Sequence, residues 1–232
     1  MKGFGDEKKS KKKILNEFQI KQYQNQIMLR AFKYHSEGNI SEAKKYYQYL
    51  IKEGFKDERV FNNYGMILLN SGDLRQARIF ISKVIELNPK DDVAYSNLGG
   101  ILKELGELKE AELLIRKAIE LNPKNSTTYL NLGGILKELG KLKDAELVIR
   151  KAIELNPKDS VAYSNLGGIL QDLGKLEEAE LSARKAIEIK SDYADAYLNL
   201  GVILKDLGKL QEAELSYRKA IEIKPNYAEA YF

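Results

Sequence analysis

The sequence is built from two kinds of amphipathic segment that follow one another along the chain. In one kind, apolar side chains recur three and four residues apart at Tyr95, Leu98, Ile101, Leu102 and Leu105. In the other kind, they recur in the same way at Leu108, Ala111, Leu114, Ile115, Ala118 and Ile119. Residues with this spacing lie on one face of a helix. The pattern therefore predicts pairs of amphipathic helices and an all-α fold.

Glycine and proline mark the ends of the predicted helices. Gly106 separates the two segments, and a glycine in the left-handed conformation commonly follows the last turn of a helix. The second segment stops at Asn122, because the residue before a proline is pushed out of the helical region. Asp91 lies just before the first segment and can cap that helix. We therefore expect helix–turn–helix units.

These units recur with a period of 34 residues. Pro89, Pro123 and Pro157 are spaced by this interval, and Pro225 lies two intervals further along. The tripeptide Asn-Leu-Gly recurs with the same period. Five copies share one register, and they span 58–91, 92–125, 126–159, 160–193 and 194–227. A repeat of this length is typical of helical solenoids, in which each copy packs mainly on its neighbours.

A sixth and more divergent copy precedes these five. Residues 24–57 keep Gly38, Ala43 and Leu50 at the repeat positions but lack the Asn-Leu-Gly tripeptide. We expect residues 14–57 to form a helical lead-in and a divergent first repeat.

The two ends of the chain differ from the repeats. Residues 1–13 contain six lysines, and we expect them to form a disordered tail. After the repeats of 58–227, residues 228–232 match the start of a seventh copy, and we expect a truncated repeat there. A solenoid without a capping helix leaves the apolar flank of its last repeat exposed, which favours end-to-end self-association.

The charge of the chain is concentrated in its lysine-rich tail. The formal net charge is +4, residues 1–13 alone carry that charge, and the remaining residues hold 32 basic and 32 acidic side chains. Proteins that bind nucleic acid need an electropositive surface, so we do not expect nucleic acid along the repeats. An association of the tail with nucleic acid or an anionic membrane surface remains an alternative.

The composition offers few of the side chains that commonly take part in catalysis. The chain has no cysteine and a single histidine, His35, which excludes thiolate chemistry and histidine-rich metal sites. We expect no catalytic residues, no metal and no cofactor, and we interpret His35 as a surface residue. The longest aliphatic stretch, Met66 to Leu69, is far too short to cross a bilayer, and no signal peptide is visible. We expect a soluble, cytoplasmic protein without a transmembrane segment.

The repeat pattern resembles the tetratricopeptide repeat family. That family's units carry an aromatic residue at position 4, Leu-Gly at 7 and 8, alanine at 20 and 27, and proline at 32. One copy fills these places with Tyr95, Leu98, Gly99, Ala111, Ala118 and Pro123. The resemblance implies a right-handed superhelix, an α-solenoid whose first helices line a concave groove. It also implies a non-catalytic scaffold that binds an extended peptide or a partner protein in that groove.

In the family, position 6 of each repeat faces the groove. In this chain, position 6 is an asparagine in five successive copies: Asn63, Asn97, Asn131, Asn165 and Asn199. An amide offers a donor and an acceptor, which can pair with the backbone of an extended peptide whatever its side chains. The array resembles the asparagine ladder in the repeat region of O-linked N-acetylglucosamine transferase. The alternative is a polar helix face that is merely solvated.

Positions 9 and 5 also vary in an informative way. Position 9 is glycine in the three central copies, at Gly100, Gly134 and Gly168. These glycines would let a ligand backbone approach closely, or they were carried along when the copies duplicated. Position 5 alternates between serine and leucine, at Ser96, Leu130, Ser164 and Leu198, which predicts alternating shallow apolar contacts.

The sequence thus favours a protein-interaction scaffold over an enzyme. One alternative is the recognition arm of a glycosyltransferase or sulfotransferase system that lacks its catalytic domain, because similar arrays precede such domains in larger relatives. The second alternative is the surface association of the lysine tail.

Overall fold

The structure, a computed structural model, describes residues 4–225, with side chains from residue 17 onward. These residues form twelve helices and contain no strand. The chain divides into two compact units, Met1–Ala94 and Tyr95–Phe232, which are called unit 1 and unit 2 here. The all-α expectation is confirmed.

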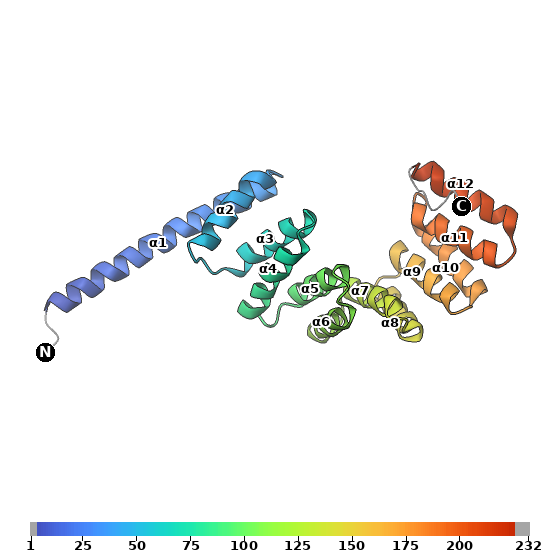
Figure 1. Cartoon of the computed structure of the whole chain (residues 1–232), viewed down its shortest axis with the longest axis horizontal. Coiled ribbons are helices and arrows are strands. Elements are labelled where there is room, and N and C mark those ends of the chain that lie inside the picture. Colours follow the sequence, from blue (N-terminus) through green and yellow to red (C-terminus); the bar gives the residue numbers. More distant parts are fainter. Residues whose placement is uncertain (1–3, 226–232) are drawn as a thin grey trace. The chain divides into compact units, whose positions relative to one another are not determined.

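Unit 1 contains two helix hairpins (Figure 1). The first joins α1 (Phe4–Ser36) to α2 (Ile40–Lys52), and the second joins α3 (Glu58–Asn70) to α4 (Leu74–Leu87). Helix α2 also packs on α3. Figure 1 shows that α1 continues well beyond its partner α2.

The start of α1 differs from the sequence-based expectation. The sequence predicts a disordered tail over residues 1–13, but the structure places residues 4–13 within α1. No glycine or proline follows Gly5 in this helix, and lysine and glutamate are good helix formers, so local propensity supports the helical state. Residues 1–3 and the predicted truncated repeat at 228–232 lie outside the described residues.

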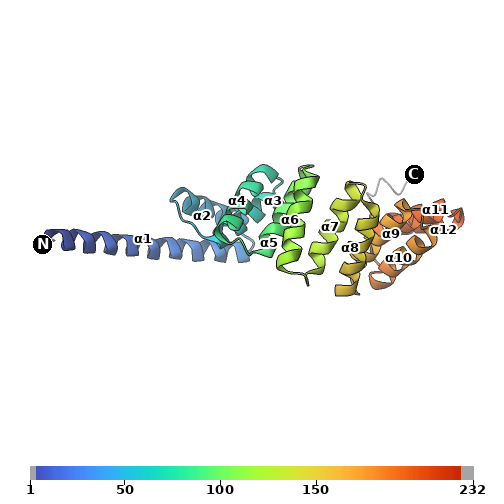
Figure 2. The same cartoon turned by 90° about the horizontal axis from the view of Figure 1, so that it is seen from below.

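Unit 2 consists of four further hairpins in tandem (Figure 2). Their helices are α5 (Asp92–Glu104), α6 (Leu108–Leu121), α7 (Ser126–Glu138), α8 (Leu142–Leu155), α9 (Ser160–Asp172), α10 (Leu176–Ile189), α11 (Ala194–Asp206) and α12 (Leu210–Ile223). Helix α9 packs on its partner α10 and also on α7 and α11, the first helices of the neighbouring repeats. First helices therefore lie next to first helices, which is the arrangement of a solenoid.

The turn within each hairpin follows the predicted glycine chemistry. Gly106 has φ +78°, its N–H donates to the carbonyl of Lys103, and the N–H of Glu107 donates to the carbonyl of Leu102. This pattern is a Schellman motif, which satisfies the last carbonyls of a helix and requires a left-handed residue. The glycines at the equivalent positions of the other hairpins have φ values of 72° to 80°.

A second glycine brings the two helices of a hairpin together. A Cβ atom on Gly99 would lie 2.6 Å from Cδ1 of Ile115 and 3.4 Å from the carbonyl oxygen of Ala111. Ala111, Ile115 and Ala118 are fully buried against the first helix. Gly99 is therefore a packing residue, and its main neighbour is the isoleucine.

Candidate functional site

Two neighbouring hollows lie along the first helices of unit 2. The smaller, of about 340 Å³, has among its lining residues Gly100, Leu130, Asn131, Gly134, Val161 and Asn165. The larger, of about 490 Å³, includes Lys103, Gly134, Lys137, Ser164, Asn165, Gly168, Asp172 and Asn199. Gly134 and Asn165 line both hollows, so we treat the two as one surface, the first-helix groove. The structure thus brings together the position 6 and position 9 residues of the central repeats.

The position 6 asparagines of unit 2 are half-buried, but they are not equivalent. Nδ2 of Asn131 donates to Oγ of Ser96 at 3.4 Å, and Nδ2 of Asn199 donates to Oγ of Ser164 at 2.9 Å. In each pair the serine occupies position 5 of the preceding repeat, so the amide is held across the repeat boundary.

Asn165 lacks such a partner. The residue at position 5 of its preceding repeat is Leu130, which has no hydrogen-bonding group. Within residues 17–225, the side chains of Asn165 and Asn97 make no hydrogen bond to another residue. The alternation of serine and leucine at position 5 therefore decides whether Asn131, Asn165 and Asn199 are already bonded, a consequence that the sequence did not reveal.

Asn63 belongs to unit 1 and has a different environment. Its Nδ2 donates to the hydroxyl of Tyr47 at 3.2 Å, and Nδ1 of His35 lies 3.2 Å from the same hydroxyl. Tyr47 is fully buried, and this burial raises the pKa of its phenol. Asn63 is thus part of a polar cluster between α1, α2 and α3. His35, interpreted from the sequence as a surface residue, is half-buried in the same cluster.

One edge of the first-helix groove is lined by ion pairs between repeats. Nζ of Lys103 lies 2.9 Å from Glu138, and Nζ of Lys137 lies 3.1 Å from Asp172. Both pairs join position 12 of one repeat to position 13 of the next. The sequence shows that basic and acidic residues both occur at these positions. Which lysine pairs with which carboxylate depends on the offset between neighbouring helices, which the sequence does not show.

The position 9 glycines lie beneath this edge. A Cβ atom on Gly134 would lie 3.5 Å from Nζ of Lys103, and one on Gly168 would lie 3.1 Å from Nζ of Lys137. A Cβ atom on Gly100 would meet nothing within 4 Å. The glycines therefore leave room for lysine side chains at two repeats and open space at the third.

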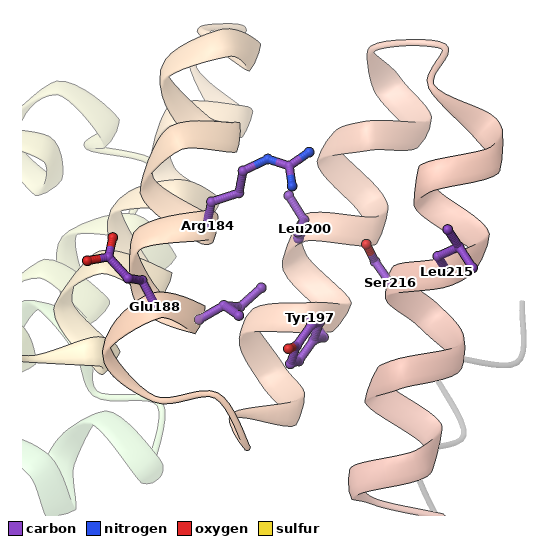
Figure 3. A pocket seen from close by; sticks show the side chains of 7 residues that line it. Arg184, Glu188, Tyr197, Leu200, Leu215 and Ser216 are labelled. Atoms are coloured by element: carbon purple, nitrogen blue, oxygen red, sulfur yellow. The ribbon is translucent and has the colours of Figure 1, made fainter.

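A further hollow of about 420 Å³ lies between α10, α11 and α12 (Figure 3). Arg184, Ile187 and Glu188 line it from α10, Tyr197 and Leu200 from α11, and Leu215 and Ser216 from α12. Its surface is mostly apolar. No sequence motif indicated it, because its residues come from three helices of two repeats.

Neither a metal site nor a membrane span is found among the described residues. Across the described part of the chain, no three histidine, cysteine or acidic side chains gather closely enough to hold a metal ion. None of the helices searched in that part is both long and apolar enough to cross a membrane.

Tandem helix hairpins in one register, with a polar groove along their first helices, define a helical-repeat scaffold for protein interactions. The comparisons agree with this class. Models described as tetratricopeptide repeat match residues 58–91, 102–168 and 194–227, and one described as TPR repeat matches residues 169–208. The chain belongs to the tetratricopeptide repeat family.

Solved structures with the same fold include several proteins of this family. YrrB, described as a TPR protein with an unusual peptide-binding site, is 28% identical, with a TM-score of 0.60 over 80% of this chain and 95% of YrrB. MamA is 25% identical, with a TM-score of 0.62 over 71% of this chain and 96% of that one. TTC0263, a TPR protein of Thermus thermophilus, is 22% identical, with a TM-score of 0.65 over 75% of this chain and 95% of TTC0263. No curated protein matches the sequence.

Proposed function

We propose that the first-helix groove of unit 2 binds an extended peptide segment of a partner protein. The observation that carries this proposal is the side chain of Asn165. It lines both hollows of the groove, and it makes no hydrogen bond to another residue within residues 17–225. A free amide can accept from a peptide N–H and donate to a peptide C=O, which gives affinity without strict demands on sequence.

The asparagines at 97, 131 and 199 extend this proposal along the repeats. Asn97 makes no hydrogen bond to another residue, like Asn165, whereas Asn131 and Asn199 each have one of their two Nδ2 N–H donors engaged by a serine and offer a ligand the carbonyl oxygen and the second N–H. Asn165, which lines both hollows, is therefore the principal anchor of the proposed ligand backbone, and Asn97, which lines neither hollow, is a secondary one. YrrB, with its peptide-binding site, is a relative that fits this function.

The walls of the groove indicate what kind of peptide it accepts. Leu130 and Val161 give the smaller hollow an apolar wall. In the larger hollow, Lys103 and Lys137 are neutralised by Glu138 and Asp172. The groove therefore suits a peptide with an apolar side chain beside polar ones, and it offers no excess positive charge for a polyanion.

Selection from a library of random unstructured peptides tests the proposal. We expect the native chain to enrich binding peptides, and we expect Asn165→Ala to weaken the enriched peptide about tenfold, the loss of two hydrogen bonds. Asn199→Ala is the matched control, because one of its two amide N–H donors is already bonded to Ser164, and we expect a smaller loss. Titration by fluorescence polarisation, with helicity checked by circular dichroism, gives the affinities.

A second variant keeps the Asn165 amide but gives it a hydrogen-bond partner within the protein. Leu130→Ser places a hydroxyl where Ser96 and Ser164 hold the following asparagine, so it should engage Asn165. It also removes the apolar side chain of Leu130 from the smaller hollow, and both changes should reduce peptide affinity. If no peptide is enriched, or if Asn165→Ala binds the enriched peptide as the native chain does, the groove is not the binding site.

A further inference from the structure

The series of ion pairs along the edge of the first-helix groove is interrupted at one place. In this series, position 12 of one repeat pairs with position 13 of the next, as Lys137 does with Asp172 at 3.1 Å. One repeat further on, position 12 is Gln171 instead of a lysine, and its Nε2 donates to Oδ2 of Asp206 at 2.6 Å. An amide is uncharged, so it satisfies one carboxylate oxygen without neutralising the negative charge.

The charge of Asp206 has no counter-charge in its surroundings. Within residues 17–225, Asp206 forms no ion pair, and its Oδ1 accepts no hydrogen bond. Lys205 precedes it in the sequence, but successive residues of a helix do not face each other, and no ion pair joins the two. Asp206 is also exposed, so a ligand can reach it.

This interrupted pair borders the proposed peptide site. Gln171 lines the larger hollow of the groove together with Asn165, Asp172 and Asn199. Asp172 occupies position 13 of its repeat, as Asp206 does in the next repeat, so the two carboxylates belong to the same edge. An extended ligand that is held at Asn165 and continues toward α11 therefore passes the Gln171–Asp206 pair.

We propose that the Gln171–Asp206 pair is a subsite for a lysine or arginine side chain of the bound peptide, an inference that rests on the proposed function. The cation brings the missing counter-charge and donates to Oδ1 of Asp206, and a charge-assisted hydrogen bond of this kind is a strong one. The apolar wall at Leu130 and Val161 belongs to the smaller hollow, on the α7 side of Asn165. The ligand thus carries an apolar residue there and a basic residue nearer α11.

An exchange of two side chains tests where the basic residue binds. The double variant Lys137→Gln, Gln171→Lys keeps the composition and the net charge of the native chain, but it moves the unpaired carboxylate by one repeat, from Asp206 to Asp172. Helices α9 and α11 pack on each other. Packed helices lie about 8–10 Å apart, and an extended peptide rises about 3.3 Å per residue. In peptides selected on this variant, we expect the basic residue to lie about three positions closer to the apolar residue.

Affinities measured by fluorescence polarisation give a second readout. For an enriched peptide, we expect an analogue with glutamine in place of its basic residue to bind the native chain about fivefold more weakly. Asp206→Asn and Gln171→Lys should each remove most of this difference, and they should leave the affinity for the glutamine analogue unchanged. Glu104→Gln is the matched control, because Glu104 occupies position 13 of repeat 92–125 but lines neither hollow. It should keep the fivefold difference.

The outcomes separate this inference from the proposed function. Enriched peptides that depend on Asn165 but carry no basic residue overturn the subsite and leave the peptide groove intact. The subsite is also overturned if the exchange variant selects the basic residue at the native position, or if Asp206→Asn distinguishes the two peptides as the native chain does, with native helicity by circular dichroism. A native chain that enriches no peptide contradicts the proposed function and this inference together.

Discussion

Two adjacent glycines on α5 have opposite roles at the scale of single residues. A Cβ atom on Gly99 would lie 2.6 Å from the buried side chain of Ile115, whereas one on Gly100 would lie in open space. Alanine is favoured over glycine in a helix by about 1 kcal/mol. We expect Gly100→Ala to raise the free energy of unfolding by about 0.5–1 kcal/mol and Gly99→Ala to lower it by roughly 1–3 kcal/mol, through overpacking.

Urea unfolding followed by circular dichroism measures both changes on the same helix. Each glycine serves as the control for the other, because the two substitutions have the same intrinsic helix propensity. Equal effects of the two alanines would contradict the packing role of Gly99.

The same Gly100 substitution separates the two interpretations of the position 9 glycines. If a peptide backbone approaches the groove at this position, Gly100→Ala weakens peptide binding while the protein becomes more stable. We expect a loss of affinity of about threefold or more, from steric exclusion alone. Titration of a peptide selected on the native chain gives the result, and unchanged affinity would favour duplication as the origin of these glycines.

At the scale of helices, three glutamates connect successive second helices. Glu112 on α6 binds Arg116 of its own helix at 2.9 Å and Lys141, just before α8, at 2.7 Å. The hydrogen bond from Lys141 holds the pKa of Glu112 below its ordinary value, against burial, which raises it. The same arrangement recurs at Glu146 and Glu180, whose pKa values are lowered first by Lys175 and Lys209.

These shifts predict how stability depends on pH. A glutamate with a lowered pKa stays ionised in the folded state at a pH where the unfolded chain takes up a proton. Its contribution is therefore complete above the ordinary pKa of roughly 4.3 and is lost as the pH falls through the lowered value. Each contribution is below about 1 kcal/mol, because the lysine and arginine partners are more than a third exposed.

Urea unfolding at pH 7 and at pH 3 measures this loss. We expect the triple variant Glu112→Gln, Glu146→Gln, Glu180→Gln to be less stable than the native chain at pH 7 and to lose less stability on acidification. A triple variant with the full native pH dependence would show that other carboxylates are responsible.

At the scale of the whole molecule, stability should vary along unit 2. Each inner hairpin packs on neighbours on both sides, whereas α12 packs mainly on α11 within the described residues. A solenoid unfolds by steps between coupled neighbours, so its terminal units open more often. We expect backbone amides of α8 and α9 to exchange at least about tenfold more slowly than those of α12. Hydrogen exchange read by mass spectrometry checks this, and uniform protection would contradict it.

The repeat pattern was enough to predict the helices and the residues at which they begin and end. The glycine at Gly106, the Asn-Pro pair at 122–123 and the helical spacing of apolar residues predict helices that the structure places at Asp92–Glu104 and Leu108–Leu121. These signals act within one repeat, where backbone geometry alone determines which residues share a face. The tail over residues 4–13 was the exception, since the expectation from charge was wrong and helix propensity prevailed.

The sequence by itself determined the all-α repeat fold and the family, because both depend on local spacing and turn chemistry, and it nominated the candidate groove residues. Only the tertiary structure decided which asparagines are free, because the bond from Asn199 to Ser164 depends on how one first helix lies against the next. It also decided that Leu181 is exposed while Ala183 is buried on the same helix. Packing between repeats causes these differences. The repeat period of the sequence does not specify the offset and rotation of neighbouring helices, on which this packing depends.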